Sequence, residues 1–315
     1  MFSALRSKIS RKPVLDPCLG DADASRLREA LEKRDWRSVR DFLNTVTDPD
    51  DRAFYLGICQ TTPGVQEWID EWTAAEPDTT LPVLVQGANG IQWAWDARGR
   101  AGSAQTTARQ FREFHRRLKV AEDHLRDVVR RDPDDVDAWS GLVTTARGLE
   151  LGKPEARRRF DEVTRRHPLH IYAHDQMLQG LCAKWFGSDK DMFSFARQAV
   201  TKSPPGNPLG HLVAVAHFEF WSGNGPDNHM TRSKVRDELH AAANHSVRHA
   251  DYRPRLGGQV SHNWFAFAFS LSGDFTAARE HFDIIGQSIT SSPWQMYGDP
   301  VEMFQKMRAE ARKRG

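Results

Sequence analysis

Apolar side chains recur every three or four residues over long stretches of this chain, most clearly between residues 106 and 131. That spacing places them on one face of a helix with 3.6 residues per turn, while the other positions are mostly charged. The apolar positions are Phe111, Phe114, Leu118, Ala121, Leu125, Val128 and Val129. The pattern predicts a long amphipathic helix with one buried face.

The end of this helix is repeated further along the chain. A segment that ends at Pro133 is matched by one that ends at Pro168, 35 residues later, and a looser copy ends at Pro204. The apolar residues before the proline are Ala121, Leu125 and Val128 in the first copy and Ala156, Phe160 and Val163 in the second. Because proline cannot continue a helix, each copy predicts a helix with a defined stop. A recurrence of this length is typical of helical repeat proteins.

The positions of apolar, charged and proline residues divide the chain into three parts. Residues 1–20 carry basic residues followed by prolines, and we expect a mobile basic leader there. Residues 21–100 are expected to form helical hairpins, and residues 105–315 the helical repeats, with a flexible connection at 99–104. Residues 81–85 are rich in branched side chains, but Pro82 suits the first turn of a helix, so we expect a helix over 81–97. The predicted fold class is all-α.

Composition narrows the classes of partner. The 44 basic and 42 acidic side chains leave a formal charge of +2, which gives no overall electrostatic basis for binding nucleic acid or a membrane. The three cysteines lack C-x-x-C spacing and favour a reducing cytoplasm. No run of 18 apolar residues occurs, so no transmembrane helix is expected. No motif indicates a cofactor.

Helical pairs that recur at about 34 residues and close at a proline are typical of the tetratricopeptide repeat (TPR). Trp139 and Leu142 stand where that family places the aromatic residue and the leucine of its first helix. The clearest single copy contains Phe265, Ala266, Phe269, Gly273, Asp274, Phe275, Ala278 and Phe282. The chain therefore resembles the TPR family over about residues 110–205 and 260–290, and segments such as 93–99 and 184–188 are similar to uncharacterised bacterial proteins of this helical type. The resemblance implies an α-solenoid of about seven stacked hairpins in a right-handed superhelix.

A solenoid of this kind presents a concave groove lined by the first helix of each pair, and such grooves bind proteins or peptides without catalysis. Projecting the repeat pattern gives the expected groove residues, which are Asp137, Ser140, Thr144, Arg147, Tyr172, Asp175, Gln179, His211, Asn263 and Phe267. The residues expected to hold the stack are Trp139, Leu142, Ala156, Phe160, Ala278 and Phe282. The Lys and Asn set by which family members clamp a carboxyl terminus has no counterpart here, and the sequence identifies no particular protein or peptide partner.

Two other functions remain open from the sequence. His170 and His174, and likewise His245 and His249, are four residues apart and would share a helix face, as the ligands of a metal-dependent hydrolase do. Neither pair has the adjacent glutamate of H-E-x-x-H, so structural histidines are favoured and no metal is expected. Arginine runs such as 157–159 alternate with acidic residues, which favours a solvated face over RNA binding.

Overall fold

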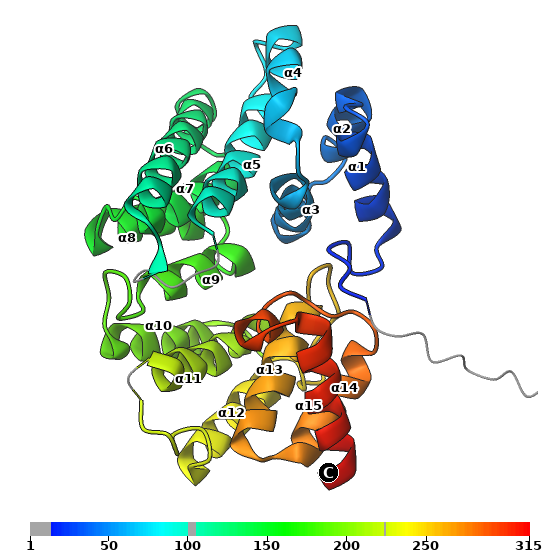
Figure 1. Ribbon diagram of the computed structural model, residues 1–315, viewed down its shortest axis with the longest axis vertical. Helices are drawn as coiled ribbons and strands as arrows, with labels where there is room; N and C mark the ends of the chain where they lie inside the picture. Colours follow the sequence, from blue (N-terminus) through cyan, green and yellow to red (C-terminus); the bar gives the residue numbers. More distant parts are fainter. Residues whose placement is uncertain (1–13, 100–104, 224) are drawn as a thin grey trace, which may run out of the picture.

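Fifteen α-helices and a few 3-10 turns make up most of the residues described by this computed structural model, which are 14–99, 105–223 and 225–315 (Figure 1). The helices are α1 (Ala22–Glu32), α2 (Trp36–Leu43), α3 (Pro49–Thr61), α4 (Ile69–Ala75), α5 (Leu81–Arg98), α6 (Ala108–Arg131), α7 (Val136–Gly148), α8 (Lys153–Arg166), α9 (Ile171–Gly180), α10 (Asp189–Lys202), α11 (His211–Gly223), α12 (Ser233–His245), α13 (Gln259–Ser272), α14 (Phe275–Ile285) and α15 (Pro300–Arg314). Within these ranges β pairing is limited to one isolated bridge, between Leu15 and Ile289. The predicted all-α class is confirmed, and none of the described helices is long and apolar enough to cross a membrane.

Side-chain caps fix where the central helices begin. Thr107 and Gln110 form a reciprocal capping box at α6, in which each side chain bonds the backbone of the other residue. The Asp135 carboxylate accepts a hydrogen bond of 2.8 Å from the backbone N–H of Ala138 at the start of α7. The helix expected over 81–97 is present as α5, with Pro82 in its first turn.

Close contacts between α5, α6 and α7 set the position of α7. A Cβ atom added at Gly87 of α5 would lie 2.9 Å from the Leu125 side chain, and one added at Gly141 of α7 would lie 2.8 Å from it. The Leu125 side chain of α6 therefore packs directly against the backbone of Gly87 in α5 and of Gly141 in α7. The close approach needs glycine at both positions.

Two clusters of buried apolar residues form the core. The first ends at Leu142 and the second begins at Val143, so they meet inside α7. The expected connection at 99–104 lies largely outside the described residues, and α5 and α6 on its two sides belong to the same cluster. Of the residues expected to hold the stack, Trp139 packs against both clusters, and Leu142, Ala156, Phe160, Ala278 and Phe282 are buried.

The periodicity of apolar residues also predicts single helices over residues 65–75 and 171–185, and the structure differs from both predictions. The helix expected over 65–75 is divided into a 3-10 turn (Val65–Glu67) and α4, because Trp68 has a backbone φ of −132° and interrupts it. The helix expected over 171–185 ends at Gly180, and the chain then turns so that the Phe186 ring lies where a Cβ on Gly180 would be, at 2.6 Å. A side chain at position 180 would prevent this turn.

Residues from opposite ends of the chain lie side by side. Residues 1–13 of the expected leader lie outside the described part, but Leu15 bridges Ile289 and Cys18 is buried. Figure 1 shows α1–α8 in the upper part of the molecule and α10–α15 in the lower part, with α9 between them. Asp50 of α3 links the two parts, since its carboxylate accepts a hydrogen bond of 3.0 Å from the Ile171 N–H of α9 and lies 3.3 Å from Arg255.

Candidate functional site

One polar stripe on α7 faces the interior of the molecule. Asp137, Ser140, Thr144 and Arg147 are spaced by three, four and three residues, so they share one face of the helix. The exposed fractions of Ser140 and Thr144 are 2%, which shows that this face is covered by other elements. A polar stripe inside a helical protein is unusual, because buried helix faces are normally apolar.

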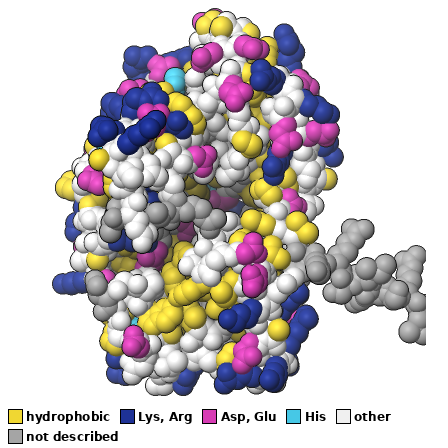
Figure 2. Space-filling view, viewed as in Figure 1, with side chains coloured by type: hydrophobic (Ala, Val, Ile, Leu, Met, Phe, Trp, Pro, Cys, Tyr) yellow, Lys and Arg dark blue, Asp and Glu magenta, His cyan; other side chains and the backbone are white. Residues whose placement is uncertain are grey.

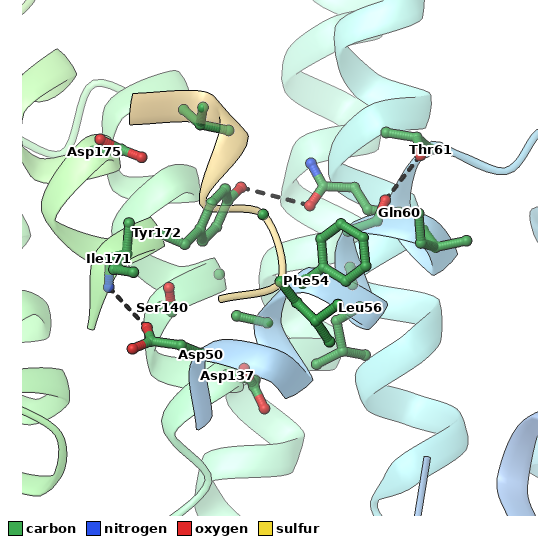
Figure 3. A pocket seen from close by; sticks show the side chains of 18 of the residues that line it. Asp50, Phe54, Leu56, Gln60, Thr61, Asp137, Ser140, Ile171, Tyr172 and Asp175 are labelled. Carbon is green, nitrogen blue, oxygen red and sulfur yellow. Dashed lines mark hydrogen bonds between the residues drawn. The ribbon is translucent and has the colours of Figure 1, made fainter. Parts of the chain in front are cut away.

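A first cavity of about 330 Å³, the central cavity, lies between this stripe and α3, α5, α9 and residues 256–261 (Figure 3). Its walls are mainly apolar, with Phe54, Leu56 and Ile171 among them. Figure 3 shows Tyr172 reaching toward Gln60 across the cavity, where the hydroxyl and the amide oxygen are 3.5 Å apart. The view of the surface in Figure 2 is hollowed between the upper and lower parts of the molecule.

Carboxylates form the polar rim of the central cavity, and each has a basic partner. Asp137 accepts a hydrogen bond of 2.9 Å from Arg52, Asp50 lies 3.2 Å from His167, and Asp175 lies 2.7 Å from His211. Burial, and then the charge of Asp135, raise the pKa of Asp137 above its usual range although Arg52 opposes this shift. The cavity wall is therefore less negative than its residue types suggest.

A second cavity of about 1140 Å³, the Arg147 cavity, adjoins the first and shares Tyr172, Asp175 and Val260 with it. It is lined by residues of α5, α6, α7, α9, α11 and α13 and by residues 184–186. The guanidinium carbon of Arg147 lies 5.6 Å from the ring centroids of both Trp95 and Trp185. These contacts are within the range of cation–π attraction.

Several buried polar atoms around the two cavities have no hydrogen-bond partner among the described residues. They are the hydroxyl oxygens of Ser140 and Thr144, Nε of Arg147 and the amide oxygen of Gln176. Three of them belong to the α7 stripe and the fourth to α9, which faces it. Because buried polar atoms in proteins are normally paired, a group of unpaired atoms beside a cavity is a feature of sites completed by a ligand or by water.

The residues predicted for the groove fall into two groups. Asp137, Ser140, Arg147, Tyr172, Asp175 and Gln179 line one or both cavities. Thr144 is buried in the same stripe without lining either cavity, whereas His211 and Phe267 lie in the core and Asn263 is held by Gln259, Ser288 and Trp294. His211, Asn263 and Phe267 do not lie on an open groove, because neighbouring elements cover the inner faces of α11 and α13.

Other lining residues were not predicted from the sequence. None of the lining residues Trp95, Gln176, Lys184, Trp185 and Glu219 was assigned to the site. Lys184 and Trp185 face the cavity because α9 ends at Gly180, five residues earlier than expected. Gln176 had a usable signal, since it lies on α9 next to Asp175 and one turn from Tyr172.

His211 touches Ser261 and Asp175 in a series that resembles a catalytic serine–histidine–aspartate arrangement. Nδ1 of His211 lies 3.2 Å from the Ser261 hydroxyl and 2.9 Å from the Pro208 carbonyl oxygen. A carbonyl oxygen can only accept, so Nδ1 carries a proton and cannot take one from Ser261. Burial opposes protonation of His211, but the Asp175 carboxylate raises its pKa above the usual value. In this series Nδ1 donates to a carbonyl oxygen and Nε2 faces Asp175, so the ring has no free nitrogen to take the proton of a serine nucleophile.

The histidines considered as metal ligands have other roles. His170 caps α9 by accepting from the Ala173 N–H, and His174 bonds the His170 carbonyl oxygen. The expected shared helix face of His245 and His249 is wrong, because α12 ends at His245 and Ser246 leaves the helical conformation. Within the ranges the structure describes, no three His, Cys, Asp or Glu side chains are placed to hold a metal ion together.

The arginine runs are paired with neighbouring carboxylates. Arg116 bonds Glu113, Arg158 bonds Glu155 and Arg165 bonds Glu162, all three residues apart on one helix. Such i,i+3 pairs are typical of a solvated helix face.

No protein-family model and no curated protein matches the chain.

Proposed function

We propose that the chain is a non-catalytic scaffold that binds a peptide segment of a partner protein in the two adjoining cavities. The observation that carries this proposal is that the α7 residues Ser140 and Arg147, which line the two cavities, keep unpaired buried polar atoms. Peptide N–H and C=O groups are the commonest donors and acceptors that could pair such atoms. An extended peptide also brings apolar side chains that suit the walls of the central cavity.

The proposal also includes the overall arrangement of the helices. We infer a TPR-like α-solenoid of about seven helical hairpins in a right-handed superhelix, supported by the 35-residue repeat of Pro133 and Pro168 and by the packing of consecutive helices such as α7 with α8 and α13 with α14. The groove of such a solenoid would contain both cavities. The three cysteines are buried thiols, which supports a cytoplasmic location as part of this proposal.

Selection of random peptides on the full chain tests the binding function. Peptides displayed on phage are selected on the wild type, and their affinities are then measured by fluorescence polarisation for Tyr172→Ala and Arg157→Met. Tyr172 lines both cavities, so its truncation is expected to weaken binding at least about tenfold, the effect of losing one well-packed aromatic contact. Arg157 lies exposed over Phe160 and Phe195 on α8, so its replacement is expected to leave binding unchanged.

Circular dichroism establishes that both variants keep the helical content of the wild type. Failure to select any peptide, or equal affinity of the selected peptides for wild type and Tyr172→Ala, would contradict the assignment of this groove.

A further inference from the structure

Arg147 is a cation without an anion. Within the described part of the chain, its side chain makes no hydrogen bond and has no carboxylate oxygen within 4 Å, and Nε is buried. Its contacts are with the rings of Trp95 and Trp185. Burial lowers the pKa of the guanidinium, but an arginine remains protonated at neutral pH. The charge of Glu219 acts on Arg147 from a distance, but no anion among the described residues contacts its guanidinium.

A fully buried arginine of the same region, Arg159, has the opposite environment. Arg159 is 0% exposed, and its Nη1 and Nη2 donate to the two carboxylate oxygens of Glu122 at 2.9 and 2.7 Å. It also donates to the Leu142 carbonyl oxygen at 2.7 Å. Where burial of a guanidinium serves the fold, its donors are thus paired with a carboxylate, as the cost of burying a charge requires. The donors of Arg147 are left available.

None of the acidic residues described around the cavity forms an ion pair with Arg147. Glu219 is engaged by Lys184 at 2.6 Å and by Gln179 at 2.9 Å, and Asp175 by His211 at 2.7 Å. Glu150 lies exposed at the rim and forms no ion pair among the described residues. The charge on Arg147 is therefore left for a group that enters from outside.

The other residues that line the cavity indicate what kind of chemical group lies next to the anion in the ligand. Trp95, Trp185 and Trp264 line the cavity together with Phe111 and Phe114. Aromatic walls stabilise flat or aliphatic groups by burial, and a guanidinium binds planar oxyanions through two parallel hydrogen bonds.

We infer that Arg147 binds an oxyanion of the ligand, a carboxylate or a phosphate, and that the neighbouring tryptophans hold an adjoining aromatic or aliphatic group. The inference rests on the proposed function, because the ligand would be a peptide segment in which an acidic or phosphorylated side chain adjoins an apolar one. The anionic group would neutralise Arg147, and the peptide backbone would continue along the α7 stripe toward Ser140.

Small probes that differ only in charge test this site on the full chain by isothermal titration calorimetry. Benzoate and benzamide have the same ring and nearly the same shape, and phenyl phosphate replaces the carboxylate with a phosphate. Wild type is expected to bind at least one of the two anions about tenfold more tightly than benzamide, the ratio that one charge-assisted contact supplies. The anion that binds more tightly identifies the oxyanion.

Two substitutions of Arg147 locate the effect. Arg147→Met keeps the length of the side chain and removes its charge, so the preference over benzamide is expected to disappear. Arg157→Met is the matched control, since that arginine also lies over two aromatic rings but outside the cavities. Arg147→Lys keeps the charge and loses the two-pronged donor, and is expected to lose most of the preference. If Arg147→Met does not fold, Arg147→Lys still tests whether the anion preference depends on Arg147.

Equal binding of anion and benzamide by the wild type would overturn the inference, and so would an anion preference that persists in both Arg147 variants. The two proposals can fail separately. If the selected peptides bind Arg147→Met and wild type equally but do not bind Tyr172→Ala, the peptide groove is supported and the anion site is contradicted. An Arg147-dependent preference for benzoate in a chain that selects no peptide would leave the anion site without the peptide function.

Discussion

Single side chains in this protein differ sharply between buried groups with complete hydrogen bonds and buried groups with unpaired polar atoms. The buried ion pairs Arg159–Glu122 and His211–Asp175 complete one another's hydrogen bonds. Ser140 and Arg147, a few residues away, keep unpaired polar atoms. Because an unpaired buried polar atom costs stability, its presence beside a cavity supports the proposed binding site.

Buried histidines predict how stability depends on pH. Burial, and then the charge of Arg248, lower the pKa of His262 to about 4, whereas an unfolded histidine titrates near 6.5. The folded state therefore binds fewer protons between these values. The contribution of His262 to the free energy of unfolding is fully present above pH 6.5. It is lost as the pH falls toward 4, at up to about 1.4 kcal/mol per pH unit.

His262→Gln is therefore expected to flatten the dependence of the free energy of unfolding on pH between 6.5 and 4.5. Urea denaturation at a series of pH values measures the slope for each protein. Replacement of the exposed His115 by Gln serves as the control and should leave the slope unchanged. A slope that is the same in His262→Gln and in wild type would show that His262 titrates normally in the folded chain.

At the scale of helices, the end of α9 decides what the site contains. The helix ends at Gly180, and residues 181–187 turn back so closely that a Cβ on Gly187 would lie 2.0 Å from the Leu181 carbonyl oxygen. This turn brings Trp185 to 6.1 Å from Trp95, and Arg147 contacts both rings. A continued helix would have carried Trp185 elsewhere.

Gly187→Ala is expected to destabilise the protein by about 1–3 kcal/mol, the usual cost of forcing extra atoms into a closed site, because the Leu181 backbone must move. It should also weaken binding of benzoate, since Trp185 moves with the turn. The control is Gly57→Ala in α3, where an added Cβ meets nothing within 4 Å and stability should rise by about 0.5–1 kcal/mol. Denaturation midpoints and calorimetry measure both effects, and an unchanged midpoint for Gly187→Ala would contradict the role of this turn.

Over the whole molecule, contacts between distant parts of the chain enclose the central cavity. A simple solenoid joins only neighbouring repeats, but here Asp50 contacts Ile171 and Arg255, and Leu15 pairs with Ile289. Burial disfavours the charge on Asp50, yet the hydrogen bonds from His167 and Ile171 lower its pKa below the usual value. The carboxylate is thus the charged link between α3, the start of α9 and residues 249–258.

Asp50→Ala is expected to lower the free energy of unfolding by about 2–3 kcal/mol, because it leaves the Ile171 N–H without its acceptor and removes the charge opposite His167. Hydrogen exchange should accelerate at the start of α9. Asp299→Ala removes a comparable cap at α15, where the carboxylate accepts from Glu302 N–H at 2.9 Å, and should cost about 1 kcal/mol. Exchange at α9 that is equally fast in both variants would exclude a specific link through Asp50.

The sequence by itself determined the helices and the polar stripe of α7. Both follow from a period of 3.6 residues, which depends only on local geometry and can be read from the order of apolar and polar residues. The positions of Asp137, Ser140, Thr144 and Arg147 on one face needed no knowledge of their neighbours. Arg147, Tyr172 and Asp175, which the same periodicity places on inner helix faces, line the Arg147 cavity.

Only the tertiary structure decided which inner faces remain open. His211 and Asn263 have the same kind of position in the repeat pattern as Arg147, but neighbouring elements cover them and supply their partners. Trp185 and Glu219 reach the Arg147 cavity through a turn and a helix that lie far from α7 in the sequence. Such contacts depend on how helices pack across long separations, and a periodic pattern contains no information on that packing.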